Sequence, residues 1–288
     1  MSYQVHNVGC APGGDAFLIT TDGKNALVDT GFLFTAKGVL KKVKDILGDR
    51  ELDYILLTHS HYDHVSGATT IKKAYPKAVI VSAEHAAKVF TKPSAIKTMG
   101  KLNRAAAIEF RRNPFYLASL KGLHTDLAVK EGDVIDLGSL KLTVLETPGH
   151  TWDTIAFWCE EESFLISNES AGVLTSSDTG VAQCLVSHRK SVEYIQRAKE
   201  LDPQHMLVPH FGMVHGEDSR KVLDIAERSV DEIKELVLSA RDQGMSKDEI
   251  LAYVKEKLWV GPLRQGQPEK AFDLNNRYMV PVILSEYP

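Results

Sequence analysis

The chain has 288 residues, of which 43% are hydrophobic and 25% are charged. This ordinary globular composition supplies apolar surface for a sizeable core and excludes a disordered chain. A formal net charge of -4, with no run of lysines and arginines, argues against a nucleic-acid partner. Three cysteines at unrelated spacings, no apolar run of membrane-spanning length and no secretory signal pattern predict a cytoplasmic protein without a membrane partner.

The first part of the chain alternates strand and helix signals. Apolar, β-branched and aromatic residues predict strands near Val5, at residues 17–20 and at residues 26–29, separated by turns rich in glycine. Apolar residues at helical spacing predict a helix over residues 33–47. The compact apolar run of residues 54–57 predicts a buried strand that leads directly into a histidine-rich segment.

The rest of the chain predicts a second alternation of strands and helices. A helix is expected from about Ser66 and a strand at residues 78–81, followed by a helical insertion over residues 84–122 with interruptions at Pro93 and Pro114. Strands are expected between residues 127 and 165 and at residues 205–208. Helices are expected over residues 187–201 and, broken near Gly244, over residues 217–258; a capping box of Ser246 and Glu249 begins the last one.

Three imidazoles and one carboxylate follow the buried strand within six positions, in the segment Thr58-His59-Ser60-His61-Tyr62-Asp63-His64. Divalent metals need several imidazole or carboxylate ligands that converge from a fixed scaffold. A tight loop can direct His59 and His61 at one point and Asp63 and His64 at a neighbouring point. The segment therefore predicts two metal sites that share one loop.

The pattern His-x-His-x-Asp-His after a strand resembles the signature of the metallo-β-lactamase superfamily. That resemblance implies a further ligand in a Thr-Pro-Gly-His-Thr turn, which residues 147–151 match with His150. It also implies a last histidine after a late strand; His210 takes this position, although the family more often has Gly-His-Gly there. Asp29, in Asp29-Thr30-Gly31, resembles the buried aspartate that supports the metal loop without binding the metal.

The chain departs from this family at the carboxylate that bridges the metals. Many relatives have Ser-Gly-Asp after the strand that follows the Pro-Gly-His turn, whereas this chain has Ser167-Asn168-Glu169. The intervals from Glu169 to His150 and to His210 suit the superfamily, so we expect Glu169 to be the bridging ligand. An exposed acid beside a strand end is the alternative interpretation, and the extra methylene leaves the occupancy of the second metal site open.

The resemblance implies an α/β fold, a four-layer αββα sandwich. Residues 1–216 would form the metallo-β-lactamase-like domain, with the helical insertion at about residues 84–122, and residues 217–288 a C-terminal helical extension packed on it. The resemblance further implies two divalent metal ions, zinc being expected and iron or manganese the alternatives. The first ion would be held by His59, His61 and His150, the second by Asp63, His64 and His210, and Glu169 would lie between them.

Two such ions activate a shared water and polarise the oxygen of the group under attack, so the resemblance implies a hydrolase. Asp63 is the predicted catalytic residue, because it can accept a proton from the water or pass it to the leaving group. The helical insertion resembles that of thioesterases of the quinolone-signal response type and implies a small thioester or ester substrate. Phe110, Phe115 and Tyr116 of the insertion would line an acyl pocket or form an ordinary helix core.

Two alternatives to a hydrolase remain. Glu169 favours a two-iron oxidoreductase, because carboxylate-rich sites suit harder metals. His61 argues against it, because flavin-linked members of the family resemble a pattern with glutamate at that position. A regulatory binding protein on the same scaffold is the other alternative, against which the retained histidines argue. A homodimer is compatible with each of these functions. The remaining histidines are expected to be structural or exposed, except that His215 follows His210 closely enough to reach the edge of the site.

Overall fold

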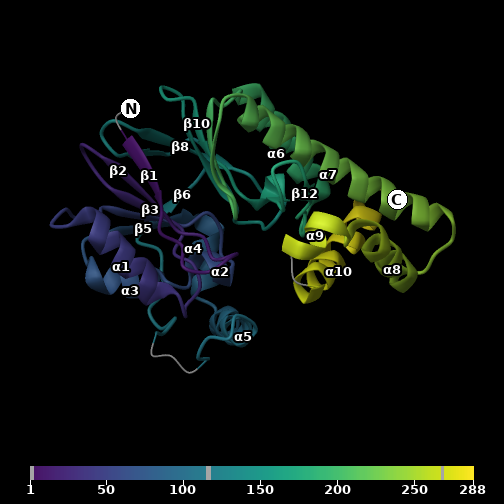
Figure 1. The fold of residues 1–288 in the computed structure, drawn as a ribbon, viewed down its shortest axis with the longest axis horizontal. Coiled ribbons are helices and arrows are strands. Elements are labelled where there is room, and N and C mark those ends of the chain that lie inside the picture. Colours follow the sequence, from purple (N-terminus) through teal and green to yellow (C-terminus); the bar gives the residue numbers. More distant parts are fainter. Residues whose placement is uncertain (1–2, 115–117, 267–268) are drawn as a thin grey trace. The chain divides into compact units, whose positions relative to one another are not determined.

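The computed structural model describes residues 3–114, 118–266 and 269–288, and it has the mixed α/β fold that was predicted (Figure 1). The chain divides into two compact units. The N-terminal unit comprises Met1–Glu146 and Phe157–Glu161, and the C-terminal unit comprises Thr147–Ala156 and Glu162–Pro288. Residue 216 lies inside the C-terminal unit, so the helices after it share a compact unit with the strands before it.

A six-stranded sheet in sequence order from β1 to β6 forms the centre of the N-terminal unit. Its strands are β1 Tyr3–Asn7, β2 Phe17–Thr21, β3 Ala26–Val28, β4 Tyr54–Leu56, β5 Val79–Ala83 and β6 Leu127–Val129. The first three strands are antiparallel, and β3 to β6 are parallel. Because Val28 is in register with Leu56, the residues that follow β3 and β4 emerge at the same edge.

The described residues of the N-terminal unit form the helices α1 Ala36–Leu47, α2 Tyr62–Val65, α3 Ala68–Ala74, α4 Glu84–Phe90 and α5 Pro93–Glu109. The apolar side chains of α1 pack into a core with residues of β4. Pro93 begins α5, where its missing amide hydrogen costs no helical bond. The last two strands before the division of the chain, β7 Val134–Asp136 and β8 Lys141–Glu146, pair antiparallel.

The helical insertion is shorter than predicted. Helix α5 ends at Glu109, and the described residues between it and β6 form turns and irregular structure. Arg111 has a φ of 52°, a left-handed conformation that an α-helix does not accommodate. The prediction of helix up to residue 122 was therefore wrong for these residues. Phe115 and Tyr116 lie outside the described residues.

The C-terminal unit contains short strands beside long helices. Strand β10 Phe164–Ile166 runs parallel to β13 His205–Val208, which pairs antiparallel with β14 Gly212–His215, while β11 Val173–Leu174 and β12 Gly180–Val181 form a separate pair. Strand β9 Ile155–Cys159 contains a point at which the chain passes between the units. The strands β11, β12 and β14 were not predicted, because two to four residues are too few to show an alternating pattern.

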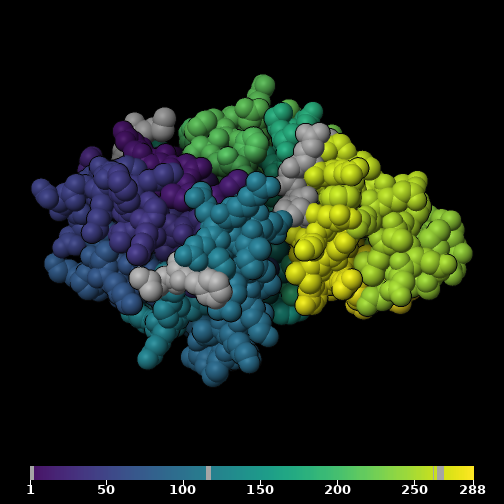
Figure 2. Space-filling view, turned by 60° about the horizontal axis from the view of Figure 1, so that its bottom comes forward, coloured from purple at the N-terminus to yellow at the C-terminus, as the bar shows by residue number. Residues whose placement is uncertain are grey.

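The helices of the C-terminal unit are η1 Glu169–Ala171, α6 His188–Leu201, α7 Glu217–Asp242, α8 Lys247–Leu258, α9 Gly261–Gly266 and α10 Glu269–Glu286. Buried residues of α7, α8 and α10, such as Ile233, Val254 and Phe272, form one apolar core, and Figure 2 shows α8 and α10 in its yellow region. The predicted capping box of Ser246 and Glu249 is confirmed. None of the described helices is both long and apolar enough to cross a membrane.

Candidate functional site

In the N-terminal unit, the histidine segment leaves β4 and turns into the short helix α2. His61 precedes that helix in an extended conformation, and its carbonyl accepts hydrogen bonds from the amides of His64 and Val65, each at 3.1 Å. This turn gathers the imidazoles. The ring centroid of His59 lies 4.7 Å from that of His61 and 4.2 Å from that of His64.

Asp29 holds this segment from the end of β3. Its side chain is buried, with 4% of the residue exposed. Oδ1 accepts a hydrogen bond from the Thr58 amide at 2.9 Å, and Oδ2 accepts one from the Thr58 hydroxyl at 2.8 Å. Oδ2 also lies 2.8 Å from Nδ1 of His64. Asp29 thus contacts the metal loop in the supporting position that the family resemblance implies.

These bonds determine which ring nitrogen of each histidine keeps its lone pair. A carboxylate only accepts, so Nδ1 of His64 carries the hydrogen and Nε2 keeps the lone pair. The Thr58 hydroxyl has one hydrogen, which it donates to Asp29, so it accepts from Nδ1 of His59 at 3.1 Å. Both histidines therefore present an Nε2 lone pair of the kind that binds divalent metals.

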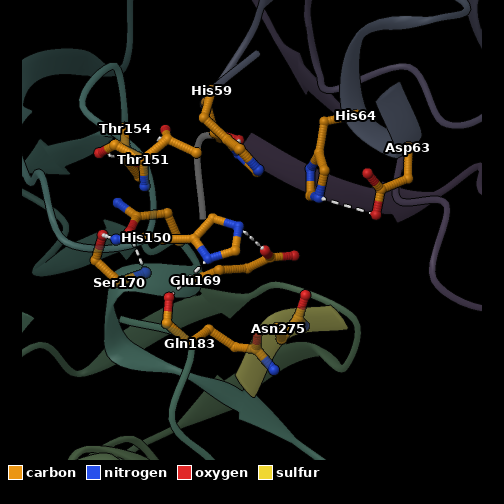
Figure 3. Close-up of polar contacts among 12 residues, drawn as sticks. His59, Asp63, His64, His150, Thr151, Thr154, Glu169, Ser170, Gln183 and Asn275 are labelled. Carbon is orange, nitrogen blue, oxygen red and sulfur yellow. Dashed lines mark hydrogen bonds and ion pairs between the residues drawn. The ribbon is translucent and has the colours of Figure 1, made fainter. Parts of the chain in front are cut away.

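Asp63 lies beside His64 on α2. Its Oδ2 is 3.8 Å from Nε2 of His64, and the two side chains point toward each other in Figure 3. The Asp63 side chain is 20% exposed, whereas that of His64 is 1% exposed. One carboxylate oxygen and one imidazole nitrogen thus lie close together. The Asp63 carboxylate is also accessible to solvent, as a group that exchanges protons must be.

In the C-terminal unit, His150 is held in the Pro-Gly-His turn by a backbone carbonyl. Its Nδ1 donates to the carbonyl oxygen of Gln183 at 2.8 Å, so Nε2 is the nitrogen that faces Glu169 and that would bind a metal. A side chain at Gly149 would bring its Cβ within 2.3 Å of Oγ of Ser191. Only glycine permits this close approach of the turn to α6, which explains the glycine before His150.

Glu169 lies between His150 and His210. Its Oε2 is 2.5 Å from Nε2 of His150, and its Oε1 contacts Nε2 of His210. The residue is buried, with 5% exposed, so the alternative interpretation of an exposed acid was wrong. Asn168 begins the 3₁₀ turn η1 that positions Glu169, and its amide donates to the Thr147 hydroxyl at 2.7 Å.

The electrostatics around Glu169 match a carboxylate that stays ionised. Burial alone raises the pKa of Glu169, but the adjacent His150 and His210 rings outweigh burial and hold this pKa well below its ordinary value. One carboxylate oxygen faces each of two imidazole nitrogens, and a bound metal ion would supply the positive charge in place of the ring protons. Imidazoles with carboxylates are the ligands that zinc and similar ions prefer. The donor set of the C-terminal unit therefore fits divalent metal ions.

His210 occupies the turn of the β13–β14 hairpin. Its φ is 61°, a left-handed conformation that non-glycine residues rarely adopt and that clusters at functional sites. Val208 pairs with Gly212 on either side of the turn, whereas His205 pairs with His215 at the open end. The prediction that His215 reaches the edge of the site beside His210 was wrong, because β14 carries His215 away from the turn.

Two supporting residues of the C-terminal unit were missed from the sequence. Gln183 acts on His150 through its backbone carbonyl, which leaves no side-chain signal. Asn275 on α10 donates to Oε1 of Gln183 at 2.7 Å, and Figure 3 shows these two side chains meeting. Asn275 lies too far along the chain from His150 for any local pattern to connect them. Helix α10 is thereby linked to the residue that orients His150.

We expect the substitution Asn275→Leu to weaken metal binding several-fold, because Gln183 loses the hydrogen bond that fixes it behind His150. Residues that orient a metal ligand change metal affinity about 10- to 100-fold, and Asn275 is one step further away. Competition with a chromophoric chelator would measure this change. Gln243→Leu is the control, since Gln243 is exposed at the C-terminal end of α7 and donates a hydrogen bond to Ser239 of that helix. Equal metal affinity in wild type and Asn275→Leu would contradict this link.

Comparison with known proteins places these features in a family. The model of the metallo-beta-lactamase superfamily matches residues 11–227. Coenzyme F420H(2) oxidase of Methanothermobacter marburgensis is 25% identical over 254 residues, which cover 87% of this chain and 51% of that protein. A hydroxyacylglutathione hydrolase of Bradyrhizobium sp. is 35% identical over 103 residues, which cover 36% of this chain and 28% of that protein. The chain thus spans about half or less of the length of these relatives.

Solved structures give the same fold. A metallo-beta-lactamase superfamily protein of Sulfolobus tokodaii matches with a TM-score of 0.63 at 17% identity, over 99% of this chain and 98% of that chain. A metallo-beta-lactamase family protein of Thermus thermophilus matches with a TM-score of 0.65 at 20% identity, over 95% and 92% of the two chains. The match of the family model over most of the chain, with the fold that these structures share, shows that the chain belongs to the metallo-β-lactamase superfamily.

Proposed function

We propose that this chain is a metal-dependent hydrolase with a dinuclear centre. The observation that carries the proposal is Glu169, a buried carboxylate with one oxygen directed at each of two imidazoles. Superfamily membership and the gathered imidazoles of the N-terminal unit support it. In this proposal the ligands are the residues that the sequence motifs predict: His59, His61, Asp63, His64, His150, Glu169 and His210.

The proposed ligands divide into two groups. His59, His61 and His150 would hold the first ion, and the second would be held by the group Asp63, His64 and His210. Glu169 would contribute one oxygen to each. Zinc is the expected metal, because imidazole-rich sites with carboxylates suit it, and iron or manganese are the alternatives.

The chemistry follows from how these side chains are held. Two bound ions would supply a water that is nucleophilic near neutral pH and an electrophilic position for a carbonyl oxygen. Asp63, partly exposed beside His64, would accept a proton during attack or deliver one to the leaving group. Thr58 accepts the Nδ1 hydrogen of His59, and Asp29 accepts that of His64, so Nε2 of each ring is the nitrogen that would bind a metal. No protein nucleophile is needed.

An aromatic cluster supports a substrate with an apolar acyl group. The ring of Phe32 lies 4.9 Å from that of Phe34, 5.7 Å from that of Tyr62 and 5.7 Å from that of Phe110, between centroids. Tyr62 stands between two of the proposed ligands in the sequence, and Phe34, Tyr62 and Phe110 are only half-buried. An apolar surface therefore borders the metal loop. Together with the relative named hydroxyacylglutathione hydrolase, this favours a small thioester or ester as substrate.

An oxidoreductase is the second candidate. Of the two sequence relatives described above, the oxidase matches the larger share of this chain, and Glu169 adds a carboxylate that harder metals such as iron prefer. One residue argues against this candidate. The flavin-linked members resemble a pattern with glutamate at the second histidine position of the loop, and this chain has His61 there. The two candidates therefore differ in the metal that supports activity and in the co-substrate that is consumed.

The test compares zinc- and iron-loaded protein on thioesters with apolar and with hydroxylated acyl groups, and measures oxygen consumption with a reduced flavin donor. We expect thioester hydrolysis that falls about 100- to 10,000-fold in Asp63→Ala. Asp45→Ala, which removes an exposed carboxylate of α1, serves as the control. Oxygen consumption without thioester hydrolysis would favour the oxidoreductase, and a chain that binds no metal would favour the regulatory binding protein.

A further inference from the structure

A second pair of histidines lies outside the proposed ligand set, at the open end of the β13–β14 hairpin. His205 begins β13, His215 ends β14, and the two residues are direct partners in the antiparallel register. Their Nδ1 atoms are 2.8 Å apart, and their ring centroids are 5.0 Å apart at an interplanar angle of 74°. Two imidazole nitrogens thus face each other across neighbouring strands.

The pair lies at the surface, where a cation in solution can reach it. His215 is exposed and His205 is half-buried. Burial and the neighbouring His215 lower the pKa of His205, although the Glu162 carboxylate acts in the opposite direction. One Nδ1 donates its hydrogen to the other across this pair, and a bound metal ion would take the place of that hydrogen. Glu162 adds a negative charge nearby. A neutral imidazole is the form that binds metals.

We propose that His205 and His215 chelate one divalent transition-metal ion, Cu²⁺ or Ni²⁺, through their Nδ1 atoms. With metal–nitrogen bonds of about 2.0 Å, two adjacent ligands of a square-planar ion lie about 2.8 Å apart, and those of a tetrahedral ion about 3.3 Å apart. The separation of 2.8 Å between the Nδ1 atoms fits the square-planar case. Water completes the coordination, so the ion is bound less tightly than in a site with three or four protein ligands.

The location of this site gives it a structural consequence. His210 occupies the turn at the other end of the same hairpin, and β13 continues three residues beyond His205, or about 10 Å, before that turn. An ion at the open end would therefore bind separately from the proposed dinuclear centre. By joining β13 to β14 it would stabilise the hairpin that presents His210, because a ligand that binds only the folded state raises its stability.

The experiment titrates the metal-loaded protein with Ni²⁺ and with Cu²⁺ and counts bound ions by elemental analysis after gel filtration. We expect wild type to take up one ion per chain more than His215→Gln, with a higher thermal unfolding temperature in Ni²⁺ and a copper spectrum that shows two nitrogen ligands. His205→Gln should lose the same ion, and the double variant should lose nothing further. His85→Gln, which removes an exposed histidine of α4, should match wild type.

Equal uptake by wild type and His215→Gln would overturn the proposal, as would an equal loss in His85→Gln, which would indicate scattered surface binding. His215 is exposed, so its replacement leaves the apolar core intact. Metal uptake by His215→Gln therefore tests the proposal even where His205→Gln folds poorly. The readouts are uptake, unfolding temperature and spectrum. A failure of the proposed hydrolase activity therefore leaves this test unaffected.

Discussion

Replacing Glu169 by alanine should reduce the bound metal from two ions per chain towards one and lower thioester hydrolysis by at least about 100-fold. The buried carboxylate directs one oxygen at His150 and the other at His210, so its loss removes a ligand from each proposed ion at once. It also removes the negative charge between the two imidazoles. Elemental mass spectrometry of protein purified without chelators or a histidine tag, with no copper or nickel added, would measure the metal.

Two variants sharpen this prediction. Glu169→Asp keeps the charge but shortens the side chain by one methylene, to the residue that many relatives have, and we expect it to retain both ions with altered turnover. Glu160→Ala removes an exposed carboxylate directly after β9 and should change neither the number of bound ions nor the rate of thioester hydrolysis. Two ions retained in Glu169→Ala would show that this carboxylate supports the fold and does not bridge metals.

The proposed ligands were identifiable from the sequence because each belongs to a short motif with its own local geometry. His59 to His64 share one turn, and the glycine before His150 reflects a contact that no other residue permits. Asp29 could be placed because parallel strands in register, β3 and β4, bring the residues after them to one edge. In each case, a few neighbouring residues carry enough information to define the position.

Supporting contacts across long stretches of chain could not be predicted in this way. Gln183 contributes a backbone carbonyl, which any residue type provides, and Asn275 reaches it from the last helix. The pairing of His205 with His215 depends on β14, a strand of four residues that the sequence pattern did not reveal. These features depend on tertiary structure, and residue type alone does not encode them.

The substitution Asp29→Asn should weaken metal binding by about 10- to 100-fold or more and lower the free energy of unfolding by about 1–3 kcal/mol. The Asp29 carboxylate accepts hydrogen bonds from the Thr58 amide, the Thr58 hydroxyl and Nδ1 of His64. An asparagine of the same shape can keep one accepting oxygen, but its NH₂ group would face two groups that also donate. His64 then has to accept at Nδ1, which places its hydrogen on Nε2 and blocks the nitrogen that binds metal.

Thr58→Val distinguishes the effect of Asp29 on His59, which acts through Thr58, from its direct effect on His64. It removes the hydroxyl that receives the hydrogen of His59 Nδ1 but leaves the direct bond from His64 to Asp29, so the ion held by His59 should be weakened more than the other. Asp53→Asn is the control for stability, because Asp53 accepts the Asn25 amide at 2.8 Å just before β4, away from the histidine segment. Urea unfolding and chelator competition should show lower stability with unchanged metal affinity in Asp53→Asn. If Asp29→Asn behaved in the same way, Asp29 would stabilise only the fold, and another group would set the protonation of His59 and His64.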